Sequence, residues 1–339
     1  MVYMAAESTS SMTYLLTGTA GFIGFRVAEL LLAAGHRVVG VDNLAPAYDL
    51  RIKDWRLAQI KKHPNFTYHH FDISDVDSVT SLFKQQQATE GRPFAAVINL
   101  AARAGVRASI ENPAVYVQTN ITGTLNLLNA CRDFEVKKFI LSSTSSLYGE
   151  GHPAPYLESL NTERMLSPYA ATKKAAEVLC YTYHYLYKID MTIFRYFTVY
   201  GPAGRPDMMP FKFVQRITEG RTIPVFGDGK QSRDFTYVDD IARGTLLGLK
   251  PVGYEIVNLG SDEPIILSDA IALMEKLIGK QAVMERLPRH PADVVATWAN
   301  IDKAKSLLGW KPQVTFEQGI QNTIDWYNAN RSWASEINT

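Results

Sequence analysis

Cysteine is scarce in this sequence, with two residues among 339, Cys131 and Cys180. Both lie inside helical patterns, and neither has the partner spacing of a disulfide framework or a zinc site. We therefore expect two reduced thiols in the core of a cytoplasmic protein, and we expect no metal centre.

Long hydrophobic runs are also missing, since no apolar stretch approaches the ~20 residues that cross a bilayer. The opening "MVYMAAESTSSMT" lacks the basic and apolar regions of a secretory signal, so residues 1–11 are expected to form a disordered tail. A net charge of +1 gives no global field for nucleic acid or a membrane surface. We expect neither as a partner.

The sequence does contain a regular alternation of short apolar runs with helical patterns. The apolar runs read as strands at 13–18, 36–42, 66–72, 95–101, 137–143 and 190–196. Strands that alternate with helices indicate parallel βαβ units, and continuous apolar strands indicate a sheet covered on both faces. This predicts an α/β fold, a Rossmann doubly wound parallel sheet with helices on both faces, spanning residues 12–203.

The composition changes after about residue 200, where proline, glycine and charge interrupt "GPAGRPDMMP" and "VFGDGKQSRDF". We expect residues 204–333 to form a smaller C-terminal α/β domain for the substrate, packed over the carboxyl edge of the sheet. The two domains should be interleaved, because residues 234–258 are expected to return to the first.

A glycine-rich turn, "TGTAGFIG" (17–24), lies between the first strand and the first helix. Such a turn lets the backbone approach a pyrophosphate and aims a helix N-terminus at its charge. Asp42 follows Gly24 by eighteen residues, close to the spacing at which an acid meets a ribose hydroxyl. Its negative charge favours NAD over the 2′-phosphorylated cofactor. The residues expected to contact NAD at this edge are Gly18, Gly21, Phe22, Ile23, Gly24, Asp42, Asn43, Asp72, Ile73, Leu100, Ala101 and Ala102.

The stretch "SPYAATKKAAEVL" (167–179) places Tyr169 and Lys173 four residues apart, on one face of a helix. An ammonium near a phenol favours the phenolate, so the pair could form a general base. The alternative is an exposed pair on a solvated helix. Five hydroxyl residues, 142–146, end a strand in "ILSSTSSLYG", where they could hold a sugar oxygen or form an ordinary Ser/Thr-rich turn.

Together the glycine turn, "SSTSSLYG" and Tyr-x-x-x-Lys resemble the extended short-chain dehydrogenase/reductase family, and within it the nucleotide-sugar epimerases. The resemblance covers Met12 to Tyr327. It implies that Tyr169 is the base and that Lys173 binds the nicotinamide ribose and lowers the tyrosine pKa. The further residues expected to contact NAD are Asn120, Ser142, Tyr169 and Tyr196. It also implies a catalytic Thr144, with Ser145 and Ser146 beside it, and a homodimer formed by helices at about 114–133 and 168–187.

The stretch "RYFTVYGPAGRPDMMPF" (195–211) resembles UDP-glucuronate 4-epimerases, because Thr198 stands where galactose-type epimerases usually have Asn. Arg205 could hold a uronate carboxylate through two parallel hydrogen bonds. It could also be a loop arginine that faces solvent or the diphosphate. "AGVR" makes Arg107 a second candidate for the carboxylate or the diphosphate.

The stretch "FGDGKQSRDFTYVDD" resembles the uridine-diphosphate site of the same family. The resemblance implies that Arg233 binds the diphosphate and that Phe226 stacks on the uracil, with Asp293 near the nucleotide ribose.

The expected reaction is the NAD-dependent, reversible C4 epimerisation of UDP-glucuronate to UDP-galacturonate through a 4-keto intermediate, with NAD as a bound prosthetic group. The alternatives on the same scaffold are a UDP-glucose/UDP-galactose 4-epimerase and a UDP-glucuronate decarboxylase. Ser146 counts against the decarboxylase, which usually carries Glu there. A dinucleotide sensor without catalysis should lack Tyr169, Lys173 or the hydroxyl residues.

Overall fold

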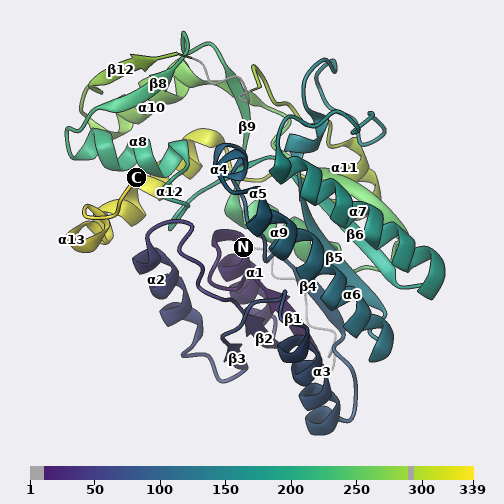
Figure 1. Cartoon of the computed structure of the whole chain (residues 1–339). Helices are drawn as coiled ribbons and strands as arrows, with labels where there is room; N and C mark the ends of the chain where they lie inside the picture. Colours follow the sequence, from purple (N-terminus) through teal and green to yellow (C-terminus); the bar gives the residue numbers. More distant parts are fainter. Residues whose placement is uncertain (1–10, 289–293) are drawn as a thin grey trace.

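The computed structural model describes residues 11–288 and 294–339, so nearly all of the expected tail lies outside the described residues. Figure 1 shows a large twisted sheet with helices on both faces and a smaller lobe above one edge of it. Among the described residues no helix has the length and apolarity needed to span a membrane. Cys131 and Cys180 are both free and buried, as the sequence predicts.

The large sheet has seven strands in the order β10-β6-β5-β4-β1-β2-β3, and every neighbouring pair is parallel. This confirms the predicted doubly wound fold. The chain order reverses between β1 and β4, and ligands bind beyond the carboxyl ends of strands at such a point. The strands are β1 (Thr13–Thr17), β2 (Arg37–Val41), β3 (Phe66–His69), β4 (Ala96–Asn99), β5 (Lys138–Thr144), β6 (Asp190–Tyr196) and β10 (Tyr254–Leu259).

Two layers of helices bury the faces of this sheet. Leu16 and Ile140 belong to the core beneath one layer, whereas their neighbours Leu15 and Leu141 belong to the core beneath the other. Because side chains alternate along a strand, burial of both faces requires the continuous apolar runs seen in the sequence. The first layer has α1 (Phe22–Ala33), α2 (Leu50–Ile60) and α9 (Val238–Leu247), and the second has α3 (Val76–Glu90), α6 (Thr124–Asp133) and α7 (Pro168–Tyr187).

The helix expected at about 114–133 is not uniform. It consists of α5 (Pro113–Tyr116), a π-helical segment η1 (Val117–Gly123) and α6, and a short α4 (Val106–Glu111) precedes it. A π turn accommodates an extra residue, so it changes which side chains face inward. Gly123 ends this segment against Ile73, and a Cβ on it would lie 2.5 Å from Ile73 Cγ1. The expected strands at 66–72 and 95–101 are also shorter, because the residues after β3 and β4 turn to line a cavity.

The smaller lobe is built on two small sheets and three helices that share a separate core. One sheet has the order β11-β9-β7, and in the other β8 pairs with β12. Its main elements are β7 (Thr198–Tyr200), α8 (Met209–Thr218), β8 (Ile223–Phe226), β9 (Ser232–Tyr237), β11 (Pro264–Ile266), α10 (Leu267–Ile278), β12 (Met284–Leu287) and α12 (Phe316–Ala329). Three short elements complete the fold, η2 (Ser145–Tyr148), α11 (Asp302–Leu308) and α13 (Arg331–Ala334).

The segment expected to return to the first domain, 234–258, divides between the two lobes. Helix α9 packs on α1 and β10 joins the large sheet beside β6, whereas β9 pairs with β7 and β11 in the smaller lobe. We retain the two interleaved domains as a proposal, with the return starting at Val238.

Candidate functional site

A cavity of about 1000 Å³ lies between the carboxyl edge of the large sheet and the smaller lobe. It brings together residues from the glycine turn, the ends of β2, β4, β5 and β6, the first two turns of α7, and the smaller lobe. Of the site residues predicted from sequence, those that line it are Gly18, Gly21, Phe22, Ile23, Gly24, Asp42, Asn43, Asp72, Ile73, Leu100, Ala101, Ala102, Arg107, Ser142, Thr144, Ser145, Ser146, Tyr169, Lys173, Tyr196, Thr198, Arg205, Phe226 and Arg233. Asp293 lies outside the described residues.

The glycine turn is too tightly packed for any side chain. A Cβ on Gly24 would lie 2.1 Å from the carbonyl oxygen of Gly18, and a Cβ on Gly18 would lie 2.7 Å from the backbone nitrogen of Ala101. Gly18 also has a φ of +73°, a conformation that L side chains rarely adopt. The turn leads into α1, whose first residue is Phe22. Its bare backbone and helix N-terminus are suited to a dinucleotide diphosphate.

Acidic and amide side chains stand beside this turn at the ends of β2 and β3. The buried Asp42 accepts hydrogen bonds from the backbone nitrogens of Ala20 (3.0 Å) and Leu44 (2.8 Å). Asn43 donates to the Asp72 carboxylate at 2.6 Å. These bonds tie the glycine turn to the sheet edge and leave Asp42, Asn43 and Asp72 facing the cavity.

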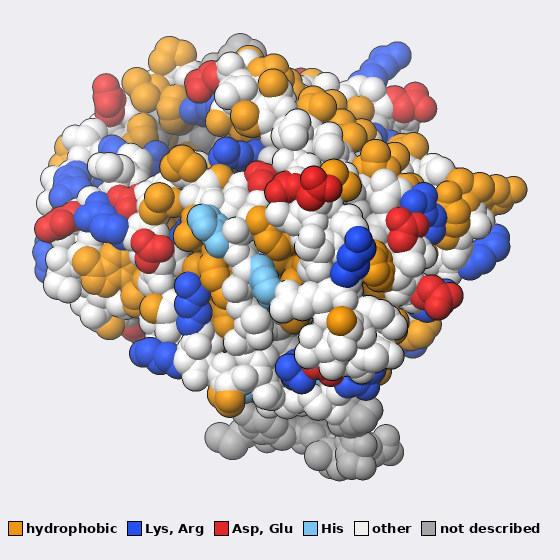
Figure 2. Space-filling model, turned by 60° about the horizontal axis from the view of Figure 1, so that its bottom comes forward, with side chains coloured by type: hydrophobic (Ala, Val, Ile, Leu, Met, Phe, Trp, Pro, Cys, Tyr) orange, Lys and Arg blue, Asp and Glu red, His pale blue; other side chains and the backbone are white. Residues whose placement is uncertain are grey.

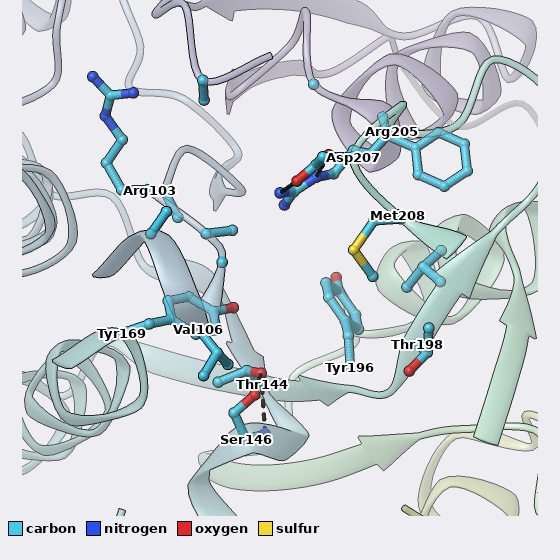
Figure 3. A pocket seen from close by; sticks show the side chains of 18 of the residues that line it. Arg103, Val106, Thr144, Ser146, Tyr169, Tyr196, Thr198, Arg205, Asp207 and Met208 are labelled. Atoms are coloured by element: carbon cyan, nitrogen blue, oxygen red, sulfur yellow. Dashed lines mark hydrogen bonds and ion pairs between the residues drawn. The ribbon is translucent and has the colours of Figure 1, made fainter. Parts of the chain in front are cut away.

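Tyr169 enters the cavity from the first turn of α7. Ser167 caps the helix by accepting a hydrogen bond from the Ala170 nitrogen, and Pro168 occupies the first helical position. Figure 3 shows the Tyr169 hydroxyl directed into the cavity near Thr144, at the end of β5. Thr144 Oγ1 accepts from the Ser146 nitrogen at 3.1 Å, which fixes the hydroxyl residues at this strand end.

Burial shifts the pKa values of both the tyrosine and the lysine. Burial raises the pKa of Tyr169, against the hydrogen bond with Thr144 and the charge of Arg205, both of which lower it. Burial lowers the pKa of Lys173 to about 8, with the nearby Glu177 carboxylate opposing the shift. In the protein without ligands, desolvation therefore outweighs the expected lowering of the phenol pKa by the lysine.

Asn120, one of the expected cofactor contacts, does not line the ligand-free cavity, and its contact with NAD stays a prediction. The π-helical segment turns it inward, where it is buried. Its Oδ1 accepts from the Arg103 nitrogen at 2.8 Å, and its Nδ2 donates to the Arg103 carbonyl and to Thr172 Oγ1 at 3.0 Å each. Asn120 thus fastens the loop after β4 to α7.

Arg205 lies across the cavity from Tyr169, as Figure 3 shows. Its Nε and Nη2 donate to the two carboxylate oxygens of Asp207 at 3.0 and 2.6 Å. Its guanidinium also lies 5.7 Å from the ring centre of Tyr48. Sequence reasoning singled out Arg205 and missed Asp207, although the two stand two residues apart in the same "GRPDM" stretch.

Arg107 and Phe226 meet on the smaller-lobe side of the cavity. The guanidinium lies 4.2 Å from the ring centre, a cation–π contact between α4 and β8. Sequence reasoning expected both near the nucleotide but did not foresee that they touch. Arg233 lies in β9, where Nη1 donates to the Ser232 carbonyl.

Two buried arginines support the site from behind. Arg195 in β6 donates Nε and Nη2 to the two carboxylate oxygens of Glu177, one helical turn after Lys173. Arg56 in α2 donates to the carbonyl oxygens of Ala20, Ala203 and Gly204. Sequence patterns gave no signal for either, because arginine is almost never fully buried without a partner, and these partners come from other segments of the chain.

Three comparisons with known proteins agree with this geometry. A family model described as GDP-mannose 4,6 dehydratase matches residues 15–323. A protein of Thermodesulfobacterium geofontis named UDP-glucuronate 4-epimerase is 55% identical over 318 residues, which is 94% of this chain and 96% of that protein.

Among solved structures, UDP-glucuronic acid 4-epimerase from Bacillus cereus, in complex with UDP-glucuronic acid and NAD, matches with a TM-score of 0.87. It is 36% identical, and the match covers 94% of this chain and 100% of that one. UDP-glucose 4-epimerase from Thermotoga maritima matches with a TM-score of 0.85 and 31% identity, over 94% of this chain and 100% of that one. The chain therefore belongs to the GDP-mannose 4,6-dehydratase family of extended short-chain dehydrogenases/reductases, where its relatives include nucleotide-sugar 4-epimerases.

Proposed function

We propose that this protein is an NAD-dependent isomerase that inverts C4 of UDP-glucuronate to give UDP-galacturonate, reversibly and through a 4-keto sugar. One observation carries the proposal. The Tyr169 hydroxyl and Arg205 face each other across the cavity that the glycine turn opens into. A base and a carboxylate-binding group thus share one cavity with a dinucleotide site. The similarity to the UDP-glucuronate 4-epimerases supports the same substrate.

The cavity fits NAD at the sheet edge. The diphosphate would lie against the glycine turn and the start of α1, both of which line the cavity. Asp42 would bind the adenosine ribose, Asp72 and Ile73 would flank the adenine, and Leu100, Ala101 and Ala102 would border the nicotinamide. Bound NAD would supply the reversible oxidation of C4, and we propose that it stays with the protein between turnovers.

Tyr169 is proposed to remove and return the proton of the C4 hydroxyl, with Thr144 holding that hydroxyl in place. Burial raises the pKa of Tyr169 in the free protein, so the phenolate needs a nearby positive charge. The nicotinamide ring and Lys173 would provide it once the cofactor is bound. Ser145 and Ser146 would complete the polar wall that faces the sugar.

Thr198 and Arg205 are proposed to hold the uronate carboxylate. A 4-keto uronic acid is a β-keto acid and loses carbon dioxide readily, so an epimerase must keep the carboxylate out of the alignment for cleavage. Arg233 and Arg107 would bind the diphosphate, and the Phe226 ring would exchange its contact with Arg107 for the uracil.

We also propose a cytoplasmic homodimer. The location is supported by the two free, buried thiols. The dimer is supported by exposed apolar side chains on α7, namely Val178, Tyr181, Tyr185 and Leu186. In Figure 2 hydrophobic side chains gather at the right-hand edge, where Figure 1 places the end of α7.

The test is a proton NMR time course on UDP-glucuronate without added NAD. Formation of UDP-galacturonate supports both the substrate and the retained cofactor, and Arg205→Ala should then lose most of the activity. A pentose product with release of carbon dioxide would make the protein a decarboxylase. If the protein turns over UDP-glucose but not UDP-glucuronate, it is a hexose epimerase. A requirement for added NAD would contradict cofactor retention.

A further inference from the structure

Asp207 places a negative charge in the cavity that is proposed to bind an anionic substrate. It lines the cavity together with Arg107, Arg205 and Lys212, and its side chain is 42% exposed. A substrate that carries a diphosphate and a carboxylate would be repelled by this charge. We therefore expect Asp207 to have a function that outweighs its repulsion of the substrate.

The local chain geometry fixes Asp207 against Arg205. The Met208 nitrogen donates to the Arg205 carbonyl at 3.2 Å, which closes a turn over Pro206 and Asp207. Proline is favoured at the second position of such a turn because its φ is preset. The turn brings the side chains two residues apart into one bidentate ion pair, immediately before α8 begins.

The atoms used in this pair determine what Arg205 can still bind. Asp207 takes Nε and Nη2, which form one edge of the planar guanidinium. A guanidinium has five N–H donors, so the edge formed by Nη1 and Nη2 keeps donors for a second carboxylate. In Figure 3 Asp207 lies behind the guanidinium and the terminal nitrogens point toward the middle of the cavity.

We propose that Asp207 is a positioning residue that selects uronate over neutral sugars by holding Arg205 with its terminal edge toward the sugar carboxylate. This inference rests on the proposed function. An unheld arginine side chain would lose rotamer entropy on binding and would grip the carboxylate in several orientations. Asp207 removes that freedom before the substrate arrives, and a fixed carboxylate also resists the alignment that releases carbon dioxide.

The test compares the intact NAD-loaded protein with its Asp207→Asn variant, which keeps the side-chain shape and removes the charge. We expect the KM and the Kd for UDP-glucuronate to rise about ten- to a hundredfold, the size of one charged hydrogen bond. The Kd values for UDP and UDP-glucose should not rise. The share of turnovers that end in carbon dioxide and a pentose should increase.

A second variant shows whether Asp207 acts through Arg205. In an Arg205→Met background, Asp207→Asn should cause no further loss, because coupled residues are not additive. Asp49→Asn is the matched control, since Arg51 also binds Asp49 through Nε and Nη2 but outside the cavity. It should leave the KM and the products unchanged.

The inference is overturned if Asp207→Asn leaves both the KM and the products unchanged, or if it weakens UDP and UDP-glucuronate equally. Tighter binding of UDP-glucuronate would overturn it too, because Asp207 would then be a competitor of the substrate. If the unaltered protein does not turn over UDP-glucuronate, the proposed function itself fails, and that result is separate from the effect of Asp207.

Discussion

At the scale of single residues, the chemistry depends on how burial acts on two groups of α7. Tyr169 and Lys173 share one helical face, and burial disfavours the charged form of both. In the ligand-free protein burial therefore favours the protonated Tyr169 hydroxyl, and its proposed role as a base requires positive charge from the bound cofactor.

Tyr169→Phe should lower kcat about 10²- to 10⁴-fold, the usual contribution of a positioned acid or base, and change the KM little. The ring still fills its place beside Tyr116, so cofactor content should stay the same. Turnover is measured by NMR, and bound NAD by release and absorbance. Tyr187→Phe, an exposed tyrosine at the other end of α7, is the control. A variant that keeps half of its kcat would remove Tyr169 from the mechanism.

Lys173 should also make stability depend on pH. Because its pKa falls from 10.5 to about 8 on folding, the unfolded chain binds more protons between these values. Its contribution to the free energy of unfolding therefore rises with pH across this window, by about 3 kcal/mol in total. Urea unfolding of the NAD-free protein from pH 7.5 to 9.5 should show that Lys173→Met lacks this rise. If the free energy of unfolding changes with pH equally in the unaltered protein and in Lys173→Met, the prediction is wrong.

Sequence reasoning at this scale placed residues in the cavity where a motif names them, and it missed contacts whose partner comes from elsewhere in the chain. Tyr169, Lys173 and the three glycines line the cavity, as the glycine spacing and the family's Tyr-x-x-x-Lys motif predict. The inward turn of Asn120 depends on a π segment that hydrophobic periodicity does not distinguish from an α-helix. The contact of Arg107 with Phe226 joins segments more than a hundred residues apart, and nothing local encodes it.

At the scale of elements, the strands and most helices could be predicted because each one buries side chains that form a regular hydrophobic pattern in its sequence. All six strands predicted in the first domain exist and pair in parallel. The lobe to which β9 belongs could not be predicted, because the strand pattern of "SRDFTY" does not specify which sheet it joins. Its place depends on β7 and β11.

The turn between β1 and α1 gives a prediction at this scale. Gly24→Ala should lose most of the bound NAD, because the new methyl group would lie 2.1 Å from the Gly18 carbonyl oxygen and force the turn open. The strain should also cost about 1–3 kcal/mol of stability. NAD content and urea unfolding measure the two effects.

Gly35→Ala, just beyond the end of the same helix, is the matched control. Its φ is +82° and nothing lies within 4 Å of the added Cβ, so it should cost stability through backbone strain alone. It should keep its NAD. Equal NAD loss in both variants would show that helix stability, and not the shape of the turn, governs cofactor binding.

At the scale of the whole molecule, the proposed dimer should depend on the exposed face of α7. Tyr185, with 64% of its surface exposed, is the most exposed residue of that apolar group. Tyr185→Glu should convert a dimer into a monomer, because a buried, unpaired carboxylate is costly at an interface. Light scattering after size exclusion measures the mass. Lys84→Glu on α3 is the control and should leave the mass unchanged. If Tyr185→Glu remains dimeric, the interface lies elsewhere.

The anchoring of the loop before Arg205 has a consequence for how this scaffold can diversify. Arg56 holds that loop through the main-chain carbonyls of Ala203 and Gly204, and it holds the cofactor turn through the carbonyl of Ala20. Carbonyl groups are present whatever the side chain, so substitutions at Arg205 and beyond, where we propose that the sugar binds, leave the anchor intact. A change of a few side chains can thus alter the specificity of the proposed sugar site without rebuilding the support that joins it to the proposed cofactor site.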